Sequence, residues 1–186
     1  GRHSVAMLKN LAEDETFTEL EEYARAIEAT FLTETGHDVF IGISEPREDL
    51  ISIPEAFEEA RSAINVGRIY HSNRTVFVYR NLLLERFLNE VTPEMSANYN
   101  SKIFNRKTAR LFNDEMLHTI EMFFAKDLNL SDTARQLYIH RNTLVYRLDK
   151  VQRQTGLDLR KFDDAVTFKM MMLLGKSGKD KPRPVY

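Results

Sequence analysis

The chain has 186 residues, no cysteine and a formal net charge of −2. The missing cysteine excludes disulfide bonds and thiolate metal sites, and the total charge indicates no partner. The longest apolar run, VTFKMMMLL, is interrupted by Lys169 and is too short to span a bilayer. No signal peptide is visible, so we expect a cytoplasmic protein without a membrane partner. A strand-like run directly after an initial Gly favours a fragment of a longer protein.

Charge is distributed unevenly along the sequence. Residues 12–59 contain fifteen Asp or Glu against two Lys or Arg, a net charge of −13. Residues 131–161 contain seven Lys or Arg against three Asp or Glu, a net charge of +4. A basic segment behind an acidic one is typical of a polyanion-binding module joined to another domain, although a merely lopsided solvated surface fits equally well.

Strand and helix patterns alternate in the first half of the chain. The expected strands are residues 3–9, 38–44 and 74–81. One helix is expected at residues 16–36, and another begins at Pro54, which the first helical turn tolerates because it does not use the missing N–H. Residues 1–81 are therefore predicted to form an α/β domain.

After Asn81 the apolar residues recur with helical spacing. Residues 82–110 are expected to be a helical linker, with a polar connecting region at 96–110. Residues 111–175 are expected to be an all-α domain with helices at 111–125, 130–137, 141–154 and 159–174. The Gly-, Pro- and Lys-rich residues 176–186 are expected to be a flexible basic tail.

A short helix, a turn and a longer helix are predicted between Ser131 and Gly156. Ser131 can cap the first helix, and Gly156 can end the second in a left-handed conformation. The second helix carries an apolar stripe that must face a core: Leu144, Leu148 and Val151. This arrangement is typical of a helix–turn–helix motif. A left-handed Tyr138 would be strained in the turn, so we expect a wider turn there.

Once the apolar stripe faces inward, the polar residues of the motif fall into two groups. Contacts to DNA bases are expected at the start of the second helix from His140, Arg141 and Asn142. Contacts to the DNA backbone are expected from Ser131, Thr143, Tyr146, Arg147 and Lys150. Asn142 and Tyr146 could equally support the turn or pack on a neighbouring helix. On spacing alone, a helical protein–protein interaction module without DNA binding stays an alternative.

The string LSDTARQLYIHRNTLVYRLDKVQRQTGLDLRKFDD, preceded by HTIEMFFAKDLN, resembles the C-terminal DNA-binding domain of the bacterial PucR/CdaR-type regulators. The resemblance covers residues 111–174 and depends on TARQL, IHRNTLVYRL and TGLDL occurring in this order. A more distant similarity to the Fis-like helix–turn–helix aligns His140, Arg141 and Thr143 with DNA-contacting positions. The resemblance implies a transcription factor that binds double-stranded DNA.

The stretch DVFIGISEPREDLISIPEAFEEARSAINVGR resembles the domain that precedes this module in the same family, a degenerate relative of the GGDEF nucleotide-cyclase fold. This resemblance covers residues 5–79. No Gly-Gly-Asp/Glu-Glu-Phe string occurs, so the resemblance implies a domain without cyclase activity. A separate N-terminal region usually senses the effector in the family, so we expect a small-molecule effector to be bound by a region that is not in this chain.

The sequence offers no candidate for a catalytic residue, a cofactor site or a metal site. Five His are scattered without HExxH spacing, and neither a GxGxxG loop nor a Gly-x-Ser-x-Gly elbow occurs. Adjacent acidic pairs on a helix point in different directions, which disfavours a shared acid–base site. We therefore expect a DNA-binding protein and not an enzyme. Because one recognition helix reads few bases, we also expect a homodimer or a higher homo-oligomer.

Overall fold

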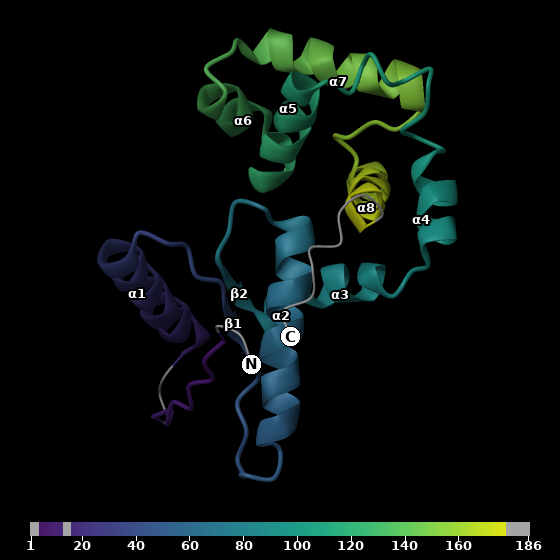
Figure 1. Cartoon of the computed structure of the whole chain (residues 1–186). Coiled ribbons are helices and arrows are strands. Elements are labelled where there is room, and N and C mark those ends of the chain that lie inside the picture. Colours follow the sequence, from purple (N-terminus) through teal and green to yellow (C-terminus); the bar gives the residue numbers. More distant parts are fainter. Residues whose placement is uncertain (1–3, 13–15, 178–186) are drawn as a thin grey trace. The chain divides into compact units, whose positions relative to one another are not determined.

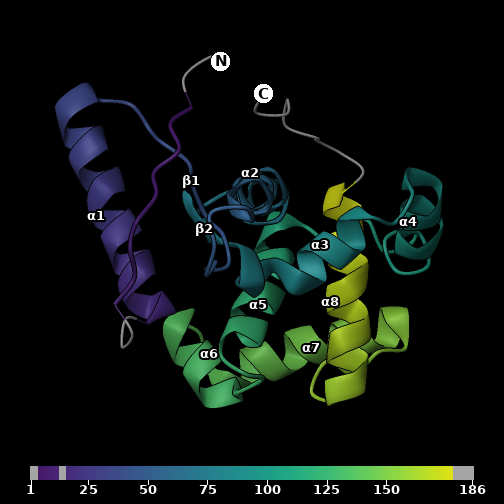
Figure 2. The ribbon, with the colours of Figure 1, turned by 90° about the horizontal axis from the view of Figure 1, so that it is seen from below.

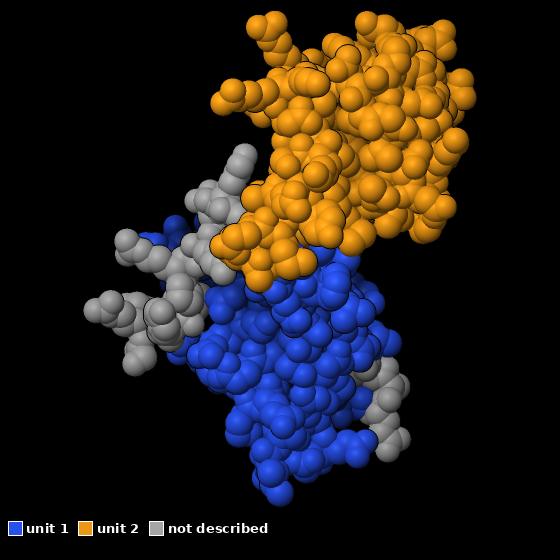
Figure 3. Space-filling model, turned by 90° about the vertical axis from the view of Figure 1, so that its right-hand side faces the viewer, with its two compact units in different colours: residues 1–91, 179–186 blue, residues 92–178 orange. Residues whose placement is uncertain are grey.

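The computed structural model describes residues 4–12 and 16–177, which divide into two compact units (Figures 1 and 3). The described residues up to Val91 belong to unit 1, and those from Thr92 onward belong to unit 2. Residues 178–186, which make up most of the expected basic tail, lie outside the described residues. None of the helices in the described ranges is long and apolar enough to cross a bilayer.

Unit 1 contains a strand–helix–strand arrangement flanked by helices. Its elements are α1 (Phe17–Thr35), β1 (Ile41–Ile43), α2 (Ile53–Tyr70), β2 (Val76–Val78), the 3-10 helix η1 (Tyr79–Leu82) and α3 (Leu83–Asn89). The two strands are parallel, with Ile41 opposite Val76, and α2 is the crossover connection between them. The described residues of unit 1 are therefore mostly helical, with a very small sheet.

The ends of α1 are set by local signals in the sequence. The Thr16 N–H donates to the Glu19 carboxylate over 2.7 Å, and the Glu19 N–H donates to the Thr16 hydroxyl over 3.3 Å. These bonds form a capping box, and the bond from the Thr16 N–H is the main cause that lowers the pKa of Glu19. At the other end, Gly36 adopts the left-handed conformation with a φ of 70°.

Two glycines allow α2 to pack closely against the strands. A Cβ atom at Gly42 would lie 2.0 Å from the carbonyl oxygen of Ala60. A Cβ atom at Gly67 would lie 2.1 Å from the ring of Phe77. Neither position has room for a side chain, so both glycines are required by the close approach of helix and sheet.

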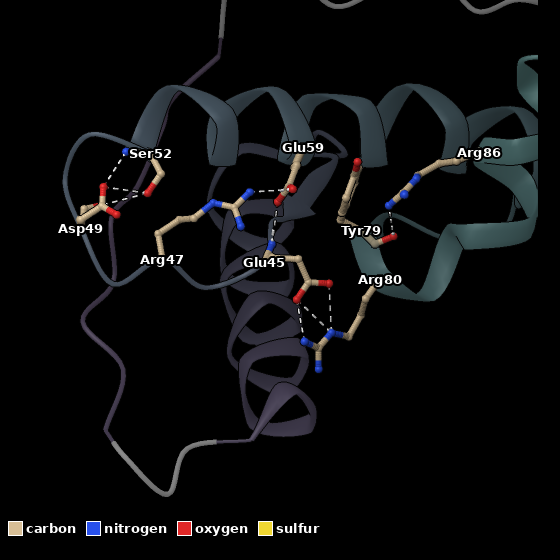
Figure 4. Close-up of polar contacts among 8 residues, drawn as sticks. All are labelled: Glu45, Arg47, Asp49, Ser52, Glu59, Tyr79, Arg80 and Arg86. Carbon is tan, nitrogen blue, oxygen red and sulfur yellow. Dashed lines mark hydrogen bonds and ion pairs between the residues drawn. The ribbon is translucent and has the colours of Figure 1, made fainter.

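Ion pairs hold the loop that joins β1 to α2 (Figure 4). Glu59 on α2 accepts the Glu45 N–H over 3.0 Å and an Arg47 guanidinium N–H over 2.7 Å. Arg80 donates from Nε to both carboxylate oxygens of Glu45, each over 3.1 Å. The base of this loop is thus bonded to both α2 and η1.

The first expected strand, at residues 3–9, is wrong. Residues 4–12 form neither strand nor helix, and Val5 and Leu8 are exposed; His3 lies outside the described residues. A strand needs a neighbour that satisfies its N–H and C=O groups, and β1 and β2 pair only with each other among the residues that the structure describes. The apolar pattern of this segment is therefore not sufficient to form a strand.

All the regular secondary structure in the described residues of unit 2 is helical. Its helices are α4 (Pro93–Asn100), α5 (Asp114–Ala125), α6 (Leu130–Gln136), α7 (Arg141–Thr155) and α8 (Phe162–Ser177). Figure 2 shows α6 beside α5 and α7, and α4 beside α8. The side-chain amide of Asn100 donates to the Met171 carbonyl over 2.7 Å, which ties α4 to α8. One core unites α5, α6, α7 and α8, and its most buried large side chains are Ile120, Phe123, Leu144, Leu148, Val151, Leu159 and Phe168.

The segment expected to be a polar connecting region contributes to this core. It forms most of α4 and then a series of turns that buries Ile103. The Phe104 ring lies 5.4 Å from the Phe168 ring, centroid to centroid. Phe112, just after the segment, lies 5.5 Å from the same ring. Polar residues dominate the segment's composition, and its few apolar residues follow no helical or strand period that would indicate their burial.

Candidate nucleic-acid interface

The N-cap of α6 lies two residues earlier than expected. The Asn129 side-chain carbonyl accepts the N–H groups of Ser131 and Asp132 over 2.9 and 3.1 Å. Asn129 is therefore the N-cap, and Ser131 is the second residue of the helix. The expected capping role of Ser131 is wrong, because Asn129 is an equally good cap residue that lies closer to the true helix start.

The turn between α6 and α7 is tight. Tyr138 has a φ of 55°, its N–H donates to the Arg135 carbonyl over 3.2 Å, and the Ile139 N–H donates to the Ala134 carbonyl over 3.0 Å. This pair of bonds is the Schellman motif that ends helices, with Tyr in the position that glycine usually takes. The expected wider turn is wrong, because Tyr138 adopts the left-handed conformation itself. Tyr138 is 94% exposed.

The apolar stripe of α7 faces the core, as predicted. Leu144 and Val151 are fully buried, and Leu148 is 1% exposed. Ile139, in the turn, packs against the same core. Because these residues turn one side of α7 toward the core, the opposite side of the helix is directed to solvent.

The first residues of α7 form an exposed polar group. His140 is the N-cap, and its Nδ1 accepts the Asn142 N–H over 3.2 Å. In the neutral ring the proton is then on Nε2, which leaves Nε2–H as a donor. His140, Arg141 and Asn142 are all exposed, so the structure brings the three expected base-contacting residues together at one helix end.

The residues expected to contact the DNA backbone lie on two helices. Thr143, Tyr146 and Lys150 are exposed on α7, and Ser131 is exposed in the first turn of α6. The Arg153 guanidinium lies 6.0 Å from the centroid of the Tyr146 ring on the same helix. Exposed hydroxyl and ammonium groups on two helices can donate to an extended polyanion.

Arg147 differs from the other residues of this group. Its Nη1 donates to the Thr119 hydroxyl over 2.7 Å, and its Nη2 forms an ion pair with the Glu115 carboxylate. The Arg147 side chain is 20% exposed, so most of it is packed against α5. The spacing along α7 indicates its flank position, but no sequence pattern indicates these partners.

The C-terminal end of α7 is anchored by an arginine that the sequence did not single out. Arg160 pairs with Asp149 over 2.9 Å and donates to the Gln152 side chain over 2.9 Å, both on α7. It also donates from Nε to the Asp158 carboxylate over 2.6 Å. This hydrogen bond is the main cause that lowers the pKa of Asp158 and raises the pKa of Arg160. In the sequence, only the repeated charges of RLDKVQRQTGLDLR could have indicated these contacts of Arg160.

Within residues 4–12 and 16–177, the structure contains no group of three or more His, Asp or Glu side chains that could hold a metal ion. The geometry of α6, the turn and α7 instead defines a helix–turn–helix protein. One helix supports a second helix, which has one face buried and a polar end exposed.

Comparison with known proteins agrees with this class. Residues 116–174 match the family model of the PucR C-terminal helix-turn-helix domain. The chain is 30% identical over 156 residues to the purine catabolism regulatory protein of Bacillus subtilis. This match covers 83% of this chain and 28% of that protein. It is 30% identical over 113 residues to the carbohydrate diacid regulator of Escherichia coli, covering 61% of this chain and 29% of that protein.

A third relative is the proline-responsive transcriptional activator PutR of Bacillus subtilis, 26% identical over 128 residues, with coverage of 67% of this chain and 31% of that protein. The chain thus spans less than a third of the length of each of these relatives. Residues 116–174 form a helix–turn–helix domain of the kind that DNA-binding transcriptional regulators carry. A protein–protein module without DNA binding is not favoured by these relatives.

Proposed function

We propose that this chain is the sequence-specific DNA-binding part of a transcriptional regulator of the PucR/CdaR type. The observation that carries the proposal is the burial of Leu144, Leu148 and Val151, which holds α7 with its first turn and its polar side in solvent. A helix of this kind fits the major groove of B-DNA, which admits an α-helix.

Base recognition is assigned to the start of α7. The Arg141 guanidinium suits the O6 and N7 acceptors of guanine, because it presents two parallel donors. The Nε2–H of His140 suits an acceptor on a base edge, since Nδ1 is occupied by the Asn142 N–H. The exposed side-chain amide of Asn142 can pair with adenine.

Binding to the DNA backbone is assigned to Ser131, Thr143, Tyr146 and Lys150, which are exposed on α6 and α7. These contacts position the protein without reading the sequence. Since Arg and Lys release counterions when they neutralise phosphates, binding weakens as the salt concentration rises. Arg147 was expected in this group, and its contacts with α5 give it a different role, described below.

Unit 1 is proposed to be a degenerate GGDEF-like α/β domain without enzymatic activity. Support comes from the parallel strand–helix–strand arrangement between Ile41 and Val78. We assign dimerisation to this unit because α1 exposes three large apolar side chains: Tyr23, Phe31 and Leu32. A strict monomer in sedimentation equilibrium at high concentration contradicts this assignment.

The regulator is proposed to act in the cytoplasm under the control of a small-molecule effector. The names of three relatives refer to purine catabolism, carbohydrate diacids and proline, which supports a metabolic effector. We assign effector binding to a part of the protein other than this chain, since the chain spans less than a third of the length of those relatives.

Selection from a random library of double-stranded DNA tests the proposed function. The full chain is incubated with the library at several salt concentrations, and the bound sequences are amplified and read. We expect enrichment of one short motif, repeated when two protomers bind together. Bound DNA without any enriched motif, or no bound DNA even at low salt, contradicts sequence-specific recognition.

A further inference from the structure

Arg147 lies on the recognition helix but directs its donors into its own domain. Nη1 donates to the hydroxyl of Thr119, a residue that is 1% exposed, and Nη2 pairs with the carboxylate of Glu115. The Thr119 hydroxyl in turn donates to the Glu115 carbonyl over 2.8 Å. We call this set of Arg147, Thr119 and Glu115 the Arg147 clamp. It joins α7 to α5 through charge-assisted hydrogen bonds.

The clamp constrains α7 in a way that its apolar stripe does not. Apolar contacts of Leu144, Leu148 and Val151 stabilise burial but have no fixed direction. A planar guanidinium bonded to two groups on one helix has a defined orientation. The clamp therefore limits rotation and sliding of α7 on α5, and these movements decide where Arg141 and His140 are placed.

We propose that Arg147 is a positioning residue for DNA recognition and not a contact to phosphate. The proposal rests on the proposed function, since it concerns how the same interface is held. Arg147 sets the angle at which the start of α7 enters the groove. Base contacts depend on this angle because they require the contacting side chains to be placed to within a fraction of an ångström. Phosphate contacts tolerate such displacement better because they are exposed and less directional.

The two roles predict different effects of salt. A phosphate-binding arginine contributes about one unit to the slope of log affinity against log salt concentration. A positioning arginine contributes none, because its charge stays paired with Glu115 in the complex. The roles also predict opposite effects on DNA affinity when the Glu115 carboxylate is removed. If Arg147 binds phosphate, affinity rises because the guanidinium is freed; if Arg147 positions α7, affinity falls because the helix is held less firmly.

The test measures affinity of the full chain for the selected site and for randomised DNA over a range of salt concentrations. The variants are Arg147→Met, Glu115→Gln and Lys150→Met. Glu121→Gln is the matched control for charge removal, because Glu121 is also on α5 and pairs with Lys176 over 3.2 Å. Lys150→Met reports a phosphate contact, which separates failure of this inference from failure of the proposed function.

We expect Arg147→Met to weaken binding to the selected site about tenfold, with an unchanged salt slope and little loss on randomised DNA. We expect Glu115→Gln to bind the selected site more weakly than Glu121→Gln does. The double variant with Arg147→Met and Glu115→Gln should bind no more weakly than Arg147→Met alone. Circular dichroism checks that each variant is folded. If Arg147→Met does not fold, Glu115→Gln still distinguishes the two roles.

Three results overturn the inference. A salt slope reduced by about one in Arg147→Met, with equal loss on both DNAs, assigns the residue to phosphate. Tighter binding by Glu115→Gln than by Glu121→Gln leads to the same conclusion. If the variants fold and bind DNA as the wild type does, the clamp contributes only to the stability of the fold. If the wild type binds no DNA, the proposed function itself is wrong.

Discussion

The guanidinium of Arg147 donates to the hydroxyl of Thr119 over 2.7 Å, joining the recognition helix to a residue 28 positions earlier in the chain. Thr119→Val removes this acceptor, and we expect the free energy of unfolding to fall by about 1–2 kcal/mol because a mostly buried charged donor loses a partner. Urea denaturation followed by circular dichroism measures the change. Thr167→Val is the control, because that hydroxyl is exposed and donates only to the Asp163 carbonyl. Equal effects of both variants contradict the expectation.

Leu148 is the central residue of the buried stripe on α7. Leu148→Ala leaves a cavity in the core of unit 2, so we expect the free energy of unfolding to fall by about 2–5 kcal/mol. Tyr146→Ala, on the exposed side of the same helix, should change it by less than about 0.5 kcal/mol. A small effect at Leu148 would mean that α7 is not held by this stripe.

Tyr138 adopts a left-handed conformation that glycine adopts without strain. We expect Tyr138→Gly to raise the free energy of unfolding by about 0.5–1 kcal/mol, since it relieves this strain and the exposed ring loses few contacts. Gln154→Gly, within α7, should instead lower it by up to about 1 kcal/mol. Thermal unfolding of both variants shows whether the two changes have opposite signs, and a destabilised Tyr138→Gly contradicts the account of the turn.

Asp158 has a lowered pKa, chiefly because its carboxylate accepts a hydrogen bond from Arg160. A group with a lowered folded pKa stabilises the fold above its unfolded pKa, and this contribution is lost as the pH falls through the folded pKa. We therefore expect Asp158→Asn to be less stable than the wild type at pH 7, and the difference to shrink as the pH falls below about 4 and to disappear once the pH is below the folded pKa. Urea denaturation across this range measures it. Arg160→Met should remove the same pH dependence, and a difference that persists in acid contradicts this origin.

The recognition helix could be predicted from the sequence because its determinants are local. The spacing of Leu144, Leu148 and Val151 defines the buried face, and Gly156 defines the end with a φ of 81°. The strand–helix–strand pattern of unit 1 was likewise visible, because both strands and α2 have clear periods. The spacing of apolar residues and the cap residues determine structure within a few positions, so their effects can be predicted from one sequence.

Other features depend on tertiary contacts and were beyond sequence reasoning. Arg147 reaches Glu115 across 32 residues, and an arginine on a helix flank is equally suited to solvent, phosphate or carboxylate. Asn129 and Ser131 are both good caps, so the helix start was ambiguous. The strain at Tyr138 costs only about 1–2 kcal/mol, which the hydrogen bonds of the turn outweigh.

Sequence-specific reading of DNA by the start of α7 is tested most directly by comparing Arg141→Ala with Lys150→Ala. Affinities for the selected site and for randomised DNA are measured at several salt concentrations. We expect Arg141→Ala to lose about 1–3 kcal/mol on the selected site only, and Lys150→Ala to weaken both DNAs equally while lowering the salt slope by about one. An Arg141→Ala variant that keeps full preference for the selected site contradicts the assignment of base recognition to the N-terminal end of this helix.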